Sequence, residues 1–78
     1  MAENLTRYLV STPADHAGDV TAELVRRGAW LDGMTSEDDV VIIRARVAPD
    51  QMGNFGTWLT RNTRGIGQVT EDSDATKP

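Results

Sequence analysis

The chain has 78 residues, a formal net charge of −4 at pH 7 and no cysteine. Its length fits one small domain with a modest core, and the lack of cysteine excludes disulfides and thiolate metal sites. No apolar run reaches the ~18 residues that a membrane span needs, and the N-terminus lacks a signal-peptide pattern. We therefore expect a cytoplasmic protein with no membrane partner.

The charged residues are unevenly distributed. Seven of the 8 basic residues are arginines, whereas the acids concentrate at residues 37–39 and 71–74. A net acidic domain attracts phosphate backbones poorly at long range. Free RNA or DNA is therefore disfavoured as the main partner, although arginine clusters can contact RNA when another part of a complex supplies the docking.

The chain opens with a predicted strand and helix. Residues 7–10 are rich in strand formers, and Thr12 and Pro13 then start a helix, with Thr12 as the N-cap. Gly28 ends the helix. The apolar residues on the buried face of this helix recur at spacings of three and four, at Ala17, Val20 and Leu24.

The middle of the chain is predicted to form two strands, at residues 29–34 and 40–47, joined by an acidic turn. Alternate residues of the second of these strands fall on opposite faces. One face is apolar throughout, at Val41, Ile43, Ala45 and Val47. The other begins apolar and ends charged, at Val40, Ile42, Arg44 and Arg46. This pattern is typical of a sheet that helices cover on one side only.

A second helix and a weak strand complete the domain. Pro49 opens the helix, residues 63–65 end it, and residues 66–70 form the strand. The buried face of the helix comprises Met52, Phe55, Gly56 and Leu59. Residues 1–5 are predicted to be a flexible N-terminus, and residues 71–78 an acidic disordered tail.

The order β-α-β-β-α-β over residues 6–70 predicts an α+β fold. Specifically, it predicts a ferredoxin-like split βαββαβ sandwich, in which a four-stranded antiparallel sheet carries two helices on one face.

Short motifs along the chain resemble one family. They are Thr12-Pro13, Gly18-Asp19-Val20, Leu24, Arg26-Arg27-Gly28, Gly33-Met34, Ile43-Arg44-Ala45, Val47 and Met52. In order and spacing they resemble the C-terminal domain of elongation factor G. The run from Leu59 to Gly67 is similar to the threonine–arginine–glycine–x–glycine segment in the BipA branch of that superfamily. The resemblance covers roughly residues 8–70 and implies a ferredoxin-like fold.

The resemblance also implies partners. In that family the last domain approaches ribosomal RNA and the stalk-base protein, and GTP hydrolysis belongs to another domain. Three features depart from the family: Pro49 lies one residue late, residues 68–71 are more polar than the family's apolar strand, and Trp30 and Trp58 replace polar residues. The start of the chain also lies close to its first strand. Together these features leave open a second hypothesis, a free-standing interaction domain that forms homodimers through its open sheet face.

Nothing in the sequence predicts catalysis or a cofactor. Gly65-Ile66-Gly67 is too short for a P-loop and fits a helix terminator. His16 is the only histidine, which disfavours a zinc site, and residues 37–39 lack the spaced oxygens and glycine of an EF-hand loop. We therefore expect a protein that is not an enzyme and binds no metal.

Four arginines at the ends of the two predicted helices are the main candidates for RNA or ribosome binding: Arg26, Arg27, Arg61 and Arg64. We expect both helix C-termini to lie at one end of the sheet, where four guanidinium groups would grip phosphates bidentately. The alternative reading, which we favour, is that these arginines compensate the helix dipoles.

A second candidate patch lies on the open sheet face and comprises Arg44, Arg46 and Trp30. The central strands carry no aromatic residues on that face, so stacking of RNA bases is not predicted. A Trp that faces outward beside Leu9 and Ile42 is more typical of a protein–protein contact.

Overall fold

The computed structural model describes residues 5–71. Along the chain its elements are β1 (Thr6–Pro13), η1 (Ala14–His16), α1 (Ala17–Arg26), β2 (Trp30–Glu37), β3 (Val40–Val47), η2 (Pro49–Met52), α2 (Phe55–Asn62) and β4 (Gln68–Glu71), where η marks a 3-10 helix. The predicted flexible N-terminus and acidic tail lie outside the described residues, apart from Leu5 and Glu71. Glu71 is the last residue of β4 and not part of a tail.

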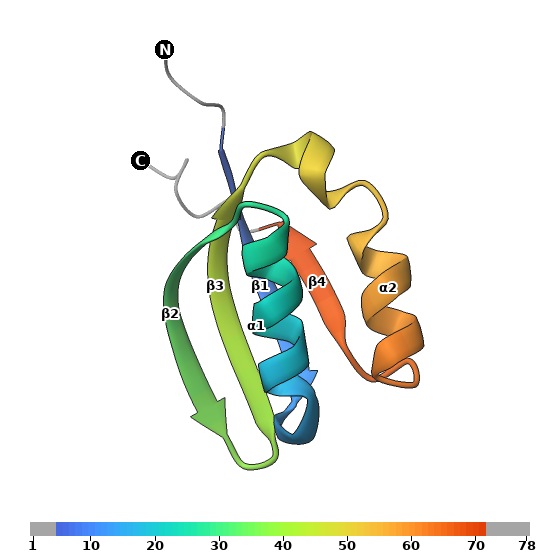
Figure 1. The fold of residues 1–78 in the computed structure, drawn as a ribbon. Coiled ribbons are helices and arrows are strands. Elements are labelled where there is room, and N and C mark those ends of the chain that lie inside the picture. The colour runs from blue at the N-terminus through green and yellow to red at the C-terminus, as the bar shows by residue number, and fades with distance from the viewer. Residues whose placement is uncertain (1–4, 72–78) are drawn as a thin grey trace.

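The four strands form one antiparallel sheet in the order β2-β3-β1-β4. Both helices lie over the same face of this sheet, and no helix of residues 5–71 lies over the other (Figure 1). The predicted ferredoxin-like α+β sandwich is therefore confirmed.

The core lies between the sheet and the helices. The apolar face of β3 is buried as its alternation predicts, with Ile43 and Val47 both fully inaccessible to solvent. The buried apolar side chains are Val10, Val20, Leu24, Val41, Ile43, Ala45, Val47, Phe55 and Leu59. Trp58 stacks on Phe55 with 5.6 Å between ring centroids and covers one side of this core.

Both helices begin later than the sequence predicts. β1 continues to Pro13, and Thr12 is a buried strand residue opposite Val41, so its prediction as the N-cap is wrong. Its hydroxyl donates to the carbonyl of Pro13 at 3.1 Å. Thr12 stays in the strand because its backbone hydrogen bonds to β3 and the burial of its side chain stabilise the fold more than one N-cap hydrogen bond would. A 3-10 helix likewise follows Pro49, and α2 starts only at Phe55.

Two strand boundaries also differ from the prediction. β2 extends beyond Met34 to Glu37, because the turn to β3 tightens to Asp38 and Asp39. Asp38 adopts a left-handed φ of 57°, which short polar side chains tolerate. At the other end of the chain, β4 begins at Gln68 and not at Ile66.

The two helices run in opposite directions. α1 follows β1 and α2 follows β3, and these two strands pair antiparallel. The C-terminus of α1 therefore lies at one end of the sheet and that of α2 at the other (Figure 1). The prediction that both C-termini lie at one end is wrong, because it left out the antiparallel pairing of the strands that precede the helices.

The α2–β4 turn (residues 63–67) is held by one buried hydroxyl. Thr63 Oγ1 donates to the carbonyl of Leu59 at 2.6 Å and accepts from the backbone N–H of Gly67 at 2.7 Å. Arg64 and Gly65 between them adopt left-handed φ values of 58° and 83°. The threonine and the two glycines of the threonine–arginine–glycine–x–glycine motif thus end the helix, and each of these three meets a geometric need of the turn.

We expect Gly67→Ala to lower the free energy of unfolding by about 1–3 kcal/mol. A Cβ at Gly67 would lie 2.7 Å from Thr63 Oγ1 and 2.8 Å from Leu59 Cγ, and both side chains are buried. Urea denaturation measures the effect. Gly18→Ala is the control, because a Cβ there meets nothing within 4 Å; equal midpoints for the two variants would contradict the prediction.

Candidate nucleic-acid interface

The structure sorts the seven arginines into three separate groups. The helix-end pair is Arg26 and Arg27, at the C-terminus of α1. The turn arginines are Arg61 and Arg64, around the C-terminus of α2. The sheet-face cluster is Arg7, Arg44 and Arg46, on the helix-free face. Since the helices are antiparallel, the first two groups lie at opposite ends of the sheet (Figure 1). The predicted grip of four guanidinium groups on one phosphate region does not form.

Arg27 has a structural role. Its guanidinium donates to Glu23 Oε2 at 2.9 Å, to the carbonyl of Gln51 at 2.9 Å and to Asn54 Oδ1 at 3.0 Å. It also lies over the ring of Phe55, 5.2 Å from the centroid. The end of α1 is thereby joined to the segment that starts α2. With only 13% of its side chain exposed, Arg27 has little capacity left for a phosphate.

Arg26 is the opposite case. Its side chain is 78% exposed, and its one ionic contact within residues 5–71 is to Glu23 at 3.6 Å. An exposed pair of this kind contributes little to stability, because solvent screens it.

We expect Arg27→Gln to lower the free energy of unfolding by about 1–3 kcal/mol, because it removes three hydrogen bonds of a charged donor, one of them part-buried, and the contact with the Phe55 ring. Arg26→Gln, one residue away at the same helix end, should change it by less than about 0.5 kcal/mol. Thermal and urea denaturation of both variants measure the difference. Equal losses would mean that the network around Arg27 contributes no more than an exposed charge.

The turn arginines are available to a partner. Arg61 and Arg64 are exposed, and no carboxylate of residues 5–71 lies within 4 Å of either. Ile66, between Arg64 and the start of β4, is 62% exposed. The sequence prediction placed Ile66 in the fourth strand and missed its exposure. The hydroxyl of Thr63 fixes the backbone here, so these three side chains, here named the turn surface, project from a rigid support.

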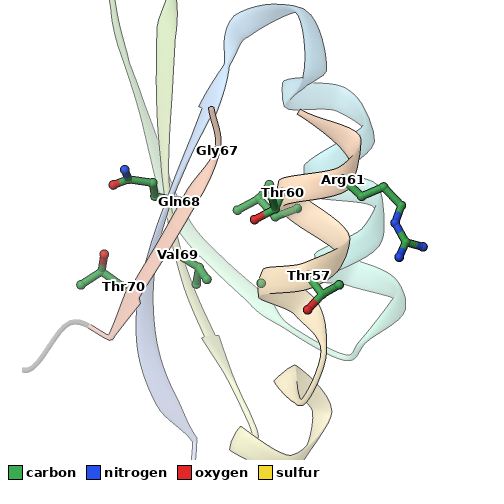
Figure 2. A pocket seen from close by; sticks show the side chains of 9 residues that line it. Thr57, Thr60, Arg61, Gly67, Gln68, Val69 and Thr70 are labelled. Atoms are coloured by element: carbon green, nitrogen blue, oxygen red, sulfur yellow. The ribbon is translucent and has the colours of Figure 1, made fainter. Parts of the chain in front are cut away.

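An open groove of about 850 Å³ runs beside the turn surface, between α2 and β4 (Figure 2). Val69 points toward α2, whereas Gln68 and Thr70 point away from it, and Arg61 extends away from β4 (Figure 2). The lining residues are Gly56, Thr57, Leu59, Thr60, Arg61, Gly67, Gln68, Val69 and Thr70. Arg61 is the only titratable side chain among them, so the groove offers shape and no acid–base chemistry.

The sheet-face cluster arises from the strand register. Arg7 of β1 stands directly opposite Arg46 of β3, and Arg44, two residues before Arg46 in β3, stands opposite Leu9. Alternation alone placed Arg44 and Arg46 on this face, but sequence reasoning left Arg7 out of the candidate site. The register supplies the missing signal, because opposed residues of an antiparallel pair share a face.

One carboxylate lies in this cluster. The fork of Arg46 holds Asp32 bidentately, with Nε 2.8 Å from Oδ2 and Nη2 2.8 Å from Oδ1. This hydrogen bonding, and then the charge of Asp32, raises the pKa of the Arg46 guanidinium above its ordinary value. The register of β2 shifts between Leu31 and Gly33, so that Asp32 is the extra residue of a bulge. Arg7 and Arg44 have no carboxylate within 4 Å among residues 5–71.

Residues 5–71 form neither a metal-binding cluster nor a membrane-spanning helix. No three His, Cys, Asp or Glu side chains come together in a way that could hold a metal ion. No helix in this part of the chain has the length and apolar composition needed to cross a membrane.

Comparison with known proteins gives one consistent result. The family model described as elongation factor G C-terminus matches residues 1–75. Elongation factor G of Granulibacter bethesdensis is 34% identical over 61 residues, which cover 78% of this chain and 9% of that protein. A crystal structure of a protein from Thermus thermophilus matches with a TM-score of 0.79 and 26% identity, over 87% of this chain and 10% of the other. This chain thus spans about a tenth of the length of either.

Proposed function

Because the chain belongs to the elongation factor G C-terminal family, we propose that it is a ribosome-contacting module of a translation factor and performs no catalysis itself. The single observation that supports this most is the family match, which spans residues 1–75. In this proposal the module works in the cytoplasm, and any GTP hydrolysis takes place outside the residues that the match covers.

The turn surface supplies the contact to ribosomal RNA. Arg61 and Arg64 keep their donors free of carboxylates of residues 5–71, and a guanidinium can grip a phosphate through two parallel hydrogen bonds. The Thr63 hydroxyl fixes the backbone of the α2–β4 turn before binding. Less conformational entropy is then lost when the contact forms.

The net charge of the chain limits what this contact achieves alone. At −4, the domain gains no long-range attraction to RNA. Its affinity for the ribosome therefore depends on a second attachment that raises the local concentration of the turn surface at its target. That is how a module of a larger factor works.

The competing hypothesis, a free-standing homodimer through the sheet face, is not favoured by the comparisons. The geometry adds a physical objection. A two-fold axis through the sheet-face cluster would set Arg7, Arg44 and Arg46 against their own copies, and like charges that face each other across an interface weaken it.

We expect Arg61→Gln and Arg64→Gln each to weaken co-sedimentation of the 78-residue chain with purified ribosomes by roughly threefold, since each removes one exposed ionic contact. Each should also lower the dependence of log affinity on log salt by about one unit. Pelleting at several salt concentrations measures both quantities.

Arg26→Gln is the matched control, because it removes the same charge from an exposed arginine at the end of the other helix. An equal loss in all three variants would show that only net charge matters and would contradict the assignment to the turn surface. Unchanged pelleting of Arg61→Gln and Arg64→Gln would contradict it as well.

A further inference from the structure

The helix-free face of the sheet has a basic end and an opposite end where apolar and polar residues, Glu37 included, are mixed. Directly opposed residues form rows across the strands, and these rows are Trp30–Arg46–Arg7, Gly33–Arg44–Leu9, Thr35–Ile42–Ser11 and Glu37–Val40–Pro13. The first two rows hold the three arginines of the sheet-face cluster. Apolar side chains follow without a break, from Leu9 through Ile42 to Val40. Each of these three is only partly buried.

The basic end is hollowed. Arg7, Leu9, Asp32, Arg44 and Arg46 line a depression there, together with parts of Tyr8 and Ala45. Gly33 adds no side chain to the row of Arg44, and a Cβ there would meet nothing within 4 Å. Trp30, at the end of the first row, is 64% exposed and borders a different hollow, which Arg27, Gly28 and Gln51 also line.

Within residues 5–71 the charges of the cluster are poorly compensated. In this part of the chain the three guanidinium groups have one carboxylate among them, that of Asp32, which Arg46 already holds. Arg7 and Arg46 stand directly opposite each other, an arrangement that like charges make unfavourable. Anionic groups placed over Arg7 and Arg44 would relieve this repulsion.

We propose that this face docks an acidic amphipathic helix of a partner protein. Its carboxylates would pair with Arg7 and Arg44, and its apolar side chains would cover Leu9 and Ile42. Arg is among the residue types most enriched where protein interfaces concentrate their binding energy, and here Arg7 and Arg44 lie beside Leu9, at the start of the apolar strip. The proposal is independent of the ribosomal role, which uses the turn surface on another part of the molecule.

The same observations disfavour RNA on this face. The helix-free sides of β1 and β3 carry no aromatic side chain on which a base could stack. A phosphate backbone would leave the apolar strip of Leu9, Ile42 and Val40 uncovered. It would also meet the carboxylate of Asp32, whereas a protein segment can offer that carboxylate a hydrogen-bond donor.

The test starts with a phage-displayed library of helical peptides whose exposed positions are randomised, selected on the 78-residue chain. We expect the enriched peptides to combine Asp or Glu with an apolar stripe. Titration of one such peptide into ¹⁵N-labelled protein should shift the amide signals of β1 and β3. Arg7→Gln with Arg44→Gln should weaken its binding roughly tenfold, and Arg61→Gln with Arg64→Gln, which changes net charge equally, should not.

Several results would overturn the proposal. In the selection, they are the enrichment of peptides without acidic residues and the absence of any enrichment. In the binding experiments, they are equal binding of the peptide to the two double variants, and shifts of the β1 and β3 signals by a short single-stranded RNA but not by the peptide. Matching melting temperatures for both double variants exclude unfolding as the cause of a loss. Because the ribosome assay uses other arginines, either proposal can fail while the other stands.

Discussion

The antiparallel pairing of β1 with β3 at the centre of the sheet is the constraint on which the rest of the structure depends. It buries Val10 against Ile43 on one face and sets Arg7 against Arg46 on the other. It also decides the direction of both helices, since each follows one of these strands. The separation of the arginines into groups is therefore a consequence of topology and not of local sequence.

The alternation of β3 predicted the sheet, its buried face and its open face correctly, because burial on one side is a local and periodic requirement. The helix starts were not predictable in the same way. As a local sequence, Thr12 and Pro13 fit the start of a helix as well as the end of a strand. Only their pairing with Val41 and Val40 across the sheet keeps them in a strand. The role of Arg27 likewise depends on residues far along the chain, Gln51 and Asn54.

The α2–β4 turn shows what a short motif can encode by itself. The hydroxyl of Thr63, the left-handed backbone of Gly65 and the missing side chain of Gly67 act within a few residues of one another. The sequence therefore predicted the helix end there. It did not predict that the turn held by the Thr63 hydroxyl exposes Ile66 beside two arginines. The exposure of Ile66 depends on where β4 begins.

The bulge at Asp32 has a consequence for how the edge of the sheet can change. Counted back from Gly33 in strict alternation, Trp30 would fall on the helix-covered side and Leu31 on the open side. The one extra residue reverses this phase, so Trp30 stands in the row of Arg46 and Leu31 in that of Ala45. If the bulge were lost and every residue type stayed the same, Trp30 would therefore move from the open face of the sheet to the helix-covered face.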